Sequence, residues 1–315
     1  MTGRLLSRAS LFIGLTGMLA CDGAVSPDDV SINSAPITSS DVLPTGRGIG
    51  ILNKFQKGEA GNSNVGGSNG ILFHGGPVMK GTVNVYYIWY GAWTGNNAPT
   101  ILTDFAQSIG GSPYHNINKT YTDGSGVPLS NAVVFAGSTT DAAYSQGKSL
   151  TDAQIKTVVS TAITRGALPL DANGVYFVLT SADVTASSGF CTKYCGWHTH
   201  ATIGGVDIKY SFIGNADRCP ASCAAQTVGP NGNAGADAMA SIVAHELEES
   251  HTDPDLNAWY DRRGYENADK CAWTFGTTYQ TPNGAQANMK LGARDYLIQR
   301  NWVNAGGGFC ALSYP

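Results

Sequence analysis

The chain has 315 residues, of which 42% are apolar and 13% are charged, and 40 of them are glycine. This length suits one large domain or two small ones, and the aromatic and β-branched content excludes a disordered chain. The formal net charge of −4 offers no basic surface for nucleic acid, so no nucleic acid partner is expected.

The N-terminus has the features of a secretory signal over residues 1–21. Arg4 and Arg8 precede an apolar stretch, residues 11–20, that is too short to span a bilayer. The sequence MLAC, which ends at Cys21, resembles a bacterial lipobox whose cysteine carries lipid. We therefore expect an exported protein, either anchored to a membrane through lipid on Cys21 or freely secreted after cleavage nearby.

Residues 22–70 are rich in Ser, Gly, Asn, Asp and Pro, which predicts a flexible linker before a domain over residues 71–315. Apolar and β-branched runs predict strands at residues 83–89, 132–135, 174–180, 206–213 and 295–303. Helical spacing of apolar residues predicts helices at 99–109, after a capping box at Thr151, and from Asp237, as N-cap, to about Ser250. Strands interspersed with helices predict a single α/β or α+β domain with a mixed sheet.

Seven cysteines are present, and six remain if Cys21 is a lipid site. An even number in an oxidising compartment predicts three disulfides, although the sequence does not choose among the connectivities. Two C-x3-C pairs could instead bind zinc, but thiolates compete poorly with oxidation outside the cell. We expect Cys271 to pair with Cys310 and hold the C-terminus. The six residues are Cys191, Cys195, Cys219, Cys223, Cys271 and Cys310.

The strongest chemical signal is the sequence HELEE at residues 245–249, on the last predicted helix. His245 and Glu249 are four residues apart, so both project from one helix face. The same spacing in H-E-x-x-H places two ligands on one zinc ion, and the glutamate beside the first histidine acts as general base. By this analogy His245 and Glu249 bind a metal and Glu246 is the catalytic base. A carboxylate as second ligand lowers the preference for zinc over calcium or manganese.

A third ligand is expected downstream of this helix. Glu266 could complete the metal site, as a glutamate on a second helix does in some zinc peptidases, and Asp269 could orient His245 from behind. Together with the order of elements, this predicts a zincin-like active-site helix, by analogy of fold. Two simpler interpretations stay open. The three acids of the helix could form a solvated face, or His245 could be a core histidine bonded to Asp269.

Several ordered motifs span most of residues 70–312. They include HGGP at 74–77, VNVYYIWYG at 83–91, CTKYCGWH at 191–198, AHEL at 244–247 and NAWY at 257–260. On these motifs the chain resembles the EXORDIUM family, also called phosphate-induced protein 1, and it is identified as a bacterial member. The resemblance implies an extracellular protein, linked in plants to cell-wall growth, with no settled biochemical activity. It also implies that Glu248 and His251 matter less than the other acidic and histidine positions of the helix.

Other motif residues could contact a substrate or a metal. His198 and His200 form an H-x-H pair whose side chains face the same way if the segment is a strand, although a disulfide-bound loop corner is the simpler interpretation. Trp197, Trp259 and Tyr260 carry flat rings suited to sugars, although most such residues pack in cores.

Three functional hypotheses follow. The first is a metal-dependent hydrolase, specifically a zincin-like peptidase with zinc as cofactor. The second is a non-catalytic cell-surface protein that binds a wall polymer and holds a structural ion such as calcium. The third is a glycosidase that uses a carboxylate pair such as Glu246 and Glu266 without metal. The expected partner is thus an extracellular peptide, protein or cell-wall polymer, and a membrane is contacted only through the lipid anchor.

Overall fold

The computed structural model describes residues 70–315. The predicted signal peptide (residues 1–21), the lipid site Cys21 and the predicted linker up to residue 69 lie outside the described residues. Within residues 70–315, no helix combines the length and the apolar character needed to cross a membrane.

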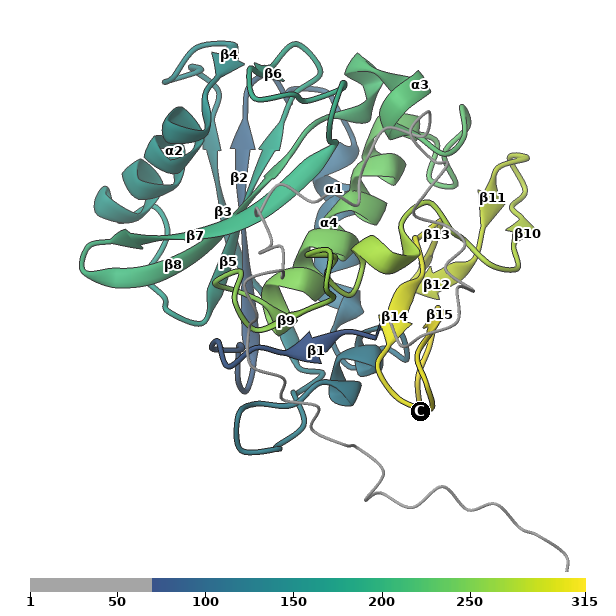
Figure 1. Cartoon of the computed structure of the whole chain (residues 1–315). Coiled ribbons are helices and arrows are strands. Elements are labelled where there is room, and N and C mark those ends of the chain that lie inside the picture. The colour runs from purple at the N-terminus through teal and green to yellow at the C-terminus, as the bar shows by residue number, and fades with distance from the viewer. Residues whose placement is uncertain (1–69) are drawn as a thin grey trace, which may run out of the picture. The chain divides into compact units, whose positions relative to one another are not determined.

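Five strands form the central sheet, in the order β3–β2–β5–β8–β7 (Figure 1). They are β2 (Val83–Tyr90), β3 (Val133–Asp141), β5 (Gly174–Thr180), β7 (Gly196–Ile203) and β8 (Val206–Ile213). The first four in the order are parallel, and β7 pairs antiparallel with β8 at one edge. This sheet and its helices confirm the prediction of a mixed α/β domain.

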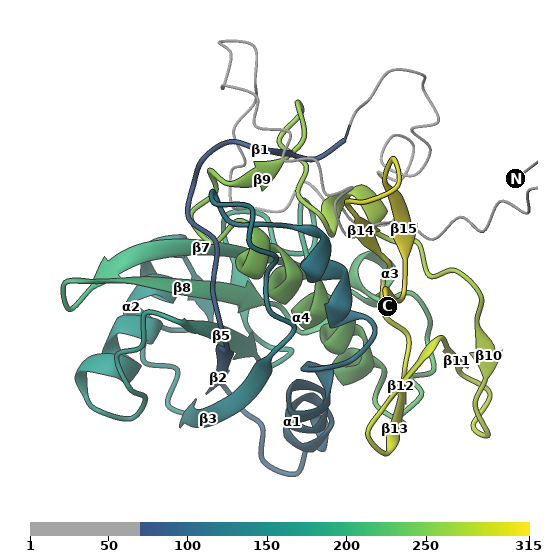
Figure 2. The same ribbon diagram turned by 90° about the horizontal axis from the view of Figure 1, so that it is seen from below.

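Helices cover both faces of the sheet because the chain crosses it in alternating directions. The crossover from β2 to β3 carries α1 (Ala98–Ile109), and the return from β3 to β5 carries α2 (Asp152–Thr164). Right-handed crossovers that run in opposite directions place their helices on opposite faces. Figure 2 shows α2 on one side and α1 with α4 (Ala234–Thr252) on the other. Every residue of β5 is therefore buried, as its continuous apolar sequence requires.

The helix α4 packs against α1, β7 and β8. It starts earlier than predicted, because the side chain of Asn233, and not that of Asp237, caps it by accepting a hydrogen bond from the backbone of Ala236. Asp237 lies in the first turn. All of residues 239–252 are buried, including three glutamates. The interpretation of these acids as a solvated face is therefore wrong.

Short elements complete the domain and differ from the predictions in two places. The strand expected at 132–135 extends to Asp141, because it pairs along the whole of β2. The strand expected at 295–303 is two strands with different partners. The short elements are β1 (Leu72–Phe73), η4 (His115–Thr120), β4 (Ser149–Leu150), β6 (Thr185–Ala186), η5 (Ala216–Arg218), α3 (Pro220–Cys223), β9 (Trp259–Tyr260), η6 (Asp269–Cys271), β10 (Tyr279–Gln280), β11 (Gln286–Ala287), β12 (Met289–Leu291), β13 (Arg294–Tyr296), β14 (Asn301–Val303) and β15 (Phe309–Ala311).

Three disulfides link the described cysteines, as the sequence predicts. Cys271 is bonded to Cys310, the pairing that was expected. The two C-x3-C segments are joined to each other, through Cys191–Cys219 and Cys195–Cys223. This double connection ties the start of β7 to α3, just before α4.

The close approach of α4 to β7 depends on Gly196. A Cβ atom there would lie 2.6 Å from Cγ2 of Ile242 and 3.0 Å from the carbonyl oxygen of Phe212. We expect Gly196→Ala to lower the free energy of unfolding by about 1–3 kcal/mol, because the added methyl group forces the helix and strand apart. Urea denaturation measures this. Gly70→Ala is the control, since a Cβ at Gly70 meets no atom within 4 Å. Equal stability of the two variants would contradict the prediction.

Candidate metal centre

Six ionisable side chains converge between α4, β7 and the loop that follows β9. The helix supplies His245, Glu246 and Glu249, and the strand supplies His198 from the face that it turns toward α4. The loop supplies Glu266 and Asp269. Each of these six side chains is at most 1% exposed: His198, His245, Glu246, Glu249, Glu266 and Asp269. We call this set the buried cluster.

His245 faces two carboxylates. Its Nε2 atom lies 2.9 Å from Oε1 of Glu249 and 3.4 Å from Oδ1 of Asp269. A backbone hydrogen bond holds each of these carboxylates. The N–H of Asp269 donates to Oε1 of Glu249 at 3.0 Å, and the N–H of Glu266 donates to Oδ2 of Asp269 at 3.2 Å. Backbone donors of this kind fix the orientation of ligand carboxylates.

His198 faces the same carboxylates from the sheet. Its Nε2 atom lies 3.1 Å from Oε1 of Glu266 and 3.7 Å from Oε2 of Glu249. Potential ligand atoms fall into two groups, each spanning less than 4.8 Å: His245 with Glu249 and Asp269, and His198 with Glu246 and Glu249. Glu249 belongs to both groups, so it is the centre of the cluster.

The structure thus brings together every residue that the sequence suggested for the metal site and its base. Asp269, expected only to orient a ligand, stands in a potential ligand group, whereas Glu266 contacts His198 and stands in neither group. His198 enters the cluster, but His200 does not. The H-x-H pair therefore does not converge on one point, although both side chains lie on the same face of β7.

The cluster contains buried polar atoms that no protein group within the described residues satisfies by a hydrogen bond. They include both carboxylate oxygens of Glu246, Nδ1 of His245 and Oε2 of Glu249. A buried oxygen or nitrogen without a partner is costly, and each such atom calls for an explanation. A cation among these atoms satisfies several of them at once.

The pKa values of the cluster residues are also shifted by burial and by the neighbouring charges. Burial, with the carboxylates of Glu249 and Asp269, raises the pKa of Glu246 well above its usual value of 4.5. Burial and neighbouring acids likewise raise the pKa of Glu249 and of Glu266. Burial lowers the pKa of His245, but Glu249 and Asp269 outweigh it and raise that pKa well above 6.5. Burial lowers the pKa of His198 to about 4. These shifts are expected of carboxyl groups that lie too close together in a dry interior.

The donor set fits a transition metal better than calcium. Each of the two ligand groups contains one imidazole and two carboxylates. Calcium takes oxygen ligands only, whereas imidazole with carboxylate suits zinc and related ions. Among the described residues, the buried cluster could therefore hold zinc or a related transition-metal ion.

A second network lies on the opposite side of α4, and sequence reasoning missed it. Nδ1 of His115 lies 2.6 Å from Oε1 of Glu248, and Nε2 of His115 lies 3.1 Å from Nδ1 of His251. Asn301 donates to the other oxygen of Glu248 at 3.0 Å. Glu248 is thus satisfied on both oxygens, unlike Glu246. No sequence signal marks this pairing, because His115 lies 133 residues away.

A third group is partly exposed and joins His200 and Asp207 of the β7–β8 hairpin with Asp255, which follows α4. Here Nζ of Lys209 lies 2.7 Å from Asp207 and 3.6 Å from Asp255. The lysine already supplies the positive charge that these carboxylates need. We therefore assign no ion to this group.

The aromatic side chains suggested as substrate contacts lie in the interior. Trp197 stacks on Phe212, and the ring nitrogen of Trp259 donates to the carbonyl oxygen of Thr122 at 2.8 Å. Tyr260 stacks on His74 with ring centroids 3.8 Å apart. All three are at most 2% exposed. Their rings therefore pack within the domain and do not form an open sugar-binding surface.

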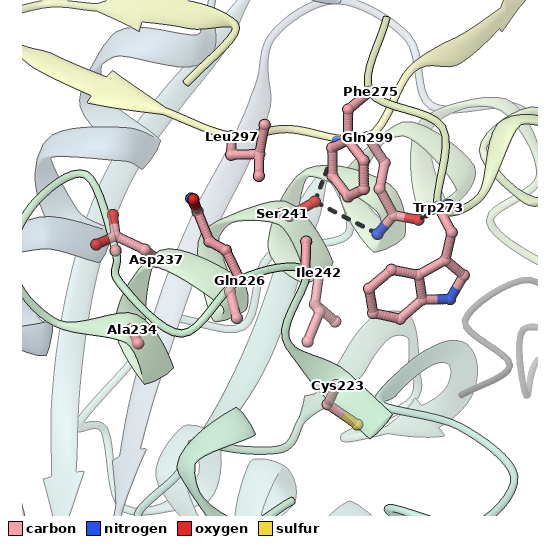
Figure 3. Close-up of a pocket in the computed structure, with 13 residues that line it drawn as sticks. Cys223, Gln226, Ala234, Asp237, Ser241, Ile242, Trp273, Phe275, Leu297 and Gln299 are labelled. Atoms are coloured by element: carbon pink, nitrogen blue, oxygen red, sulfur yellow. Dashed lines mark hydrogen bonds between the residues drawn. The ribbon is translucent and has the colours of Figure 1, made fainter. Parts of the chain in front are cut away.

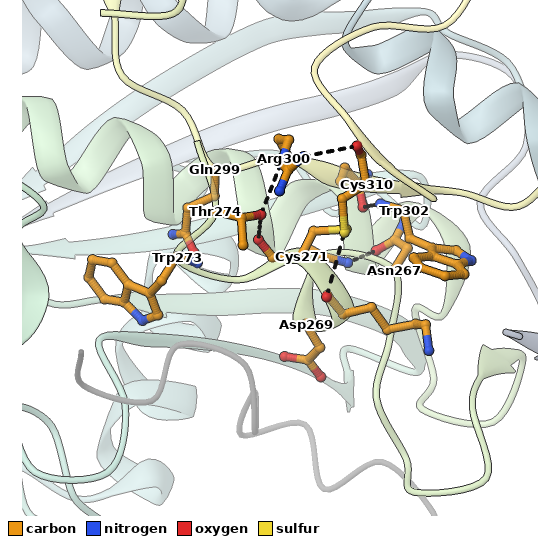
Figure 4. Close-up of a disulfide and its surroundings, with 12 residues drawn as sticks. Asn267, Asp269, Cys271, Trp273, Thr274, Gln299, Arg300, Trp302 and Cys310 are labelled. Atoms are coloured by element: carbon orange, nitrogen blue, oxygen red, sulfur yellow. Dashed lines mark hydrogen bonds between the residues drawn. A yellow bond between two sulfur atoms is a disulfide. The ribbon is translucent and has the colours of Figure 1, made fainter. Parts of the chain in front are cut away.

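The loop that carries Glu266 and Asp269 is tied to the C-terminus. Asp269 starts η6, which ends at Cys271, and this cysteine is bonded to Cys310 (Figure 4). The backbone N–H of Trp302 donates to the carbonyl oxygen of Asn267 at 3.1 Å. A covalent bond and a backbone hydrogen bond thus hold the loop against β14 and β15.

Residues 71–293 match the family described as the phosphate-induced protein 1 conserved region. The chain belongs to this family, the EXORDIUM family. EXORDIUM-like 3 of Arabidopsis thaliana is 34% identical over 271 residues, which cover 74% of this chain and 80% of the relative. EXORDIUM-like 5 of the same plant is 32% identical over 273 residues, covering 74% and 75%. PHOSPHATE-INDUCED 1 of Nicotiana tabacum is 28% identical over 218 residues, covering 60% and 67%.

No solved structure matches this EXORDIUM-family chain. The zincin-like character expected of α4 therefore has no support from fold comparison, and it rests on the geometry of the site alone. The three disulfides indicate export to an oxidising compartment, as the sequence predicts.

The pKa shifts predict how stability depends on pH once metal is removed. Groups whose pKa is raised by folding hold protons that the unfolded chain has already released, so they weaken folding as the pH rises. His198 and His251 have lowered pKa values and act in the opposite sense below pH 6.5. In and beside the cluster, the residues with raised pKa values outnumber these two histidines. They are His245, Glu246, Glu249, Asp253 and Glu266.

We therefore expect chelator-treated protein to lose stability from about pH 5 to about pH 7. Zinc added at pH 7 should restore it, because the cation stabilises the charged carboxylates. Urea denaturation at both pH values, with and without zinc, measures this. The prediction would be contradicted if the chelator-treated protein became more stable between pH 5 and pH 7. It would also be contradicted if zinc left the stability at pH 7 unchanged.

Proposed function

We propose that the protein is a zinc-dependent hydrolase of peptide bonds, with the buried cluster as its active site. The observation that carries this proposal is the set of buried atoms without a hydrogen-bond partner among the described residues: both oxygens of Glu246, Nδ1 of His245 and Oε2 of Glu249. His245, Glu249 and Asp269 would hold the ion, and their geometry supports three protein ligands in one place. Glu266 holds His198 in orientation at the edge of the site.

A zinc ion bound there would polarise the carbonyl group of a substrate and make a water molecule easier to deprotonate. Glu246 follows a ligand histidine directly, and neither of its oxygens is committed to another protein group among the described residues. It is therefore free to take a proton from the attacking water and pass it to the leaving amine. Its raised pKa suits a base that must also act as an acid.

One observation favours a second function, a wall-binding protein with a structural ion. Every member of the buried cluster is at most 1% exposed, and a structural ion is enclosed by protein whereas a catalytic one keeps an open position. A glycosidase that uses Glu246 with Glu266 is less well supported, because it gives no role to the imidazoles beside these acids.

The two consecutive positions Glu248 and Glu249 allow a matched test of metal binding. Glu249→Gln should reduce bound zinc from near one ion per chain to a trace, because Glu249 is shared by both ligand groups. Glu248→Gln should keep the zinc, because Glu248 is bonded to His115 and Asn301 on the other side of the helix. Elemental analysis of the purified proteins measures this, with His245→Ala as a further zinc-free variant. Zinc retained in Glu249→Gln, or absent from the wild type, would refute the metal site.

Removal of the proposed base separates catalysis from a structural role. Glu246→Gln should keep its zinc and fold, yet lower kcat on a peptide library by about a hundredfold or more. Mass spectrometry of the digested library detects the products. A zinc-loaded wild type that cleaves nothing would favour the structural ion, and full activity in Glu246→Gln would exclude Glu246 as the base.

A further inference from the structure

A pocket is lined in part by residues of α4 (Figure 3), and Ile242 in its wall precedes Glu246 by one helical turn. Its apolar lining includes Ile242, Trp273, Phe275 and Leu297. The point that a Cβ atom of Gly196 would occupy is 2.6 Å from Cγ2 of Ile242 and 3.1 Å from Oε1 of Glu246. Gly196 therefore packs against both Ile242, in the wall of the pocket, and the proposed base Glu246.

The pocket and the cluster are built from the same three segments. Ile242 and Glu246 occupy successive turns of α4, and Trp273 follows Asp269 by four residues in one loop. Cys223 lines the pocket and is bonded to Cys195, which directly precedes β7 and its His198. Anything seated in the pocket therefore stands in a fixed relation to the residues of the cluster.

The polar side chains of the pocket are already hydrogen-bonded within the protein. Asp237 accepts hydrogen bonds from the backbone and the side chain of Asn231. Gln299 accepts from the backbone N–H of Trp273 and donates to Oγ of Ser241 at 3.3 Å (Figure 3). Gln226 exchanges two hydrogen bonds with the backbone of Gln286, both at 2.8 Å. What the pocket offers a ligand is consequently apolar surface.

This chemistry distinguishes between two classes of polymer. A sugar ring would bring hydroxyl groups that lose water and find no free partner, which costs affinity. An aliphatic side chain has no hydrogen bonds to water to give up on entry, and it gains apolar contact with Ile242, Leu297 and the aromatic rings. The lining thus favours a peptide over a polysaccharide.

We propose that this pocket binds an aliphatic side chain of a peptide substrate, next to the bond that is cleaved at Glu246. The proposal rests on the proposed function, and it adds the specificity of the same site. Trp273 has a φ of 58°, a strained value for a residue with a side chain. Its backbone is kept there by Gln299, so the protein holds the indole ring at the pocket at a cost in conformational energy.

Binding can be measured apart from cleavage. Capped pentapeptides that differ only in the central residue (Gly, Ala, Val or Leu) are titrated by calorimetry into wild-type protein and into Glu246→Gln. We expect the Kd to fall along the series, with leucine bound roughly tenfold more tightly than alanine, because each buried methylene adds affinity.

Two pocket variants and one matched control locate the preference. Ala238→Phe fills the pocket from α4 and should abolish the gain from alanine to leucine. Ala153→Phe places the same side chain on the exposed face of α2 and should leave the gain intact. Leu297→Ala removes part of the lining and should reduce the gain, and it carries the test if Ala238→Phe does not fold.

The outcomes separate the pocket from the catalytic proposal. A leucine preference without any cleavage supports the pocket and refutes the hydrolase. Cleavage with equal Kd and equal kcat/KM along the series supports the hydrolase and overturns the pocket. A preference unchanged in both pocket variants overturns it as well, as does binding of a β-1,4-linked glucose oligomer in place of the peptides.

Discussion

The structure depends on how four carboxyl groups are accommodated in a dry interior with only two imidazoles beside them. Glu246, Glu249, Glu266 and Asp269 repel one another and lose the water that would screen them. Protonation relieves this repulsion at low pH, and the divalent cation that we propose would relieve it at neutral pH. A domain that merely needed a stable core would fill this space with apolar side chains at no such cost. The position of these acids is therefore a property of the site and not of the fold.

The fold withstands this repulsion because each segment that contributes a side chain to the cluster is held in place by separate contacts. The helix α4 is capped by Asn233 and packed on three elements, so His245 and Glu249 cannot separate. The strand β7 is held by β8 along its full length and by a disulfide at Cys195. The loop bearing Asp269 is held by the bond from Cys271 to Cys310. Mutually repelling groups thus remain in place because their backbones are restrained elsewhere.

Local pattern explains which parts could be predicted from the sequence. The strand at 174–180 is a continuous apolar run between two turns, and that at 206–213 alternates, so both were found with correct bounds. His245 and Glu249 could be paired because four residues make about one helical turn. His198 and Glu266 could not be paired in the same way, since 68 residues separate them and only the tertiary fold brings β7 and the loop after β9 together. The start of α4 was missed because Asp237 and Asn233 are both good caps, and the loop before the helix, not the local sequence, selects one.

The bond between Cys271 and Cys310 has a consequence for the source of the metal. Cys310 lies 39 residues after Cys271, so the loop is secured only once the chain has been made through Cys310. That bond forms in an oxidising compartment and not in the cytosol. An exported chain would therefore complete its ligand set after it has left the cell interior. Because metal identity in proteins follows availability as well as affinity, the ion would be chosen from what the surroundings of the cell supply.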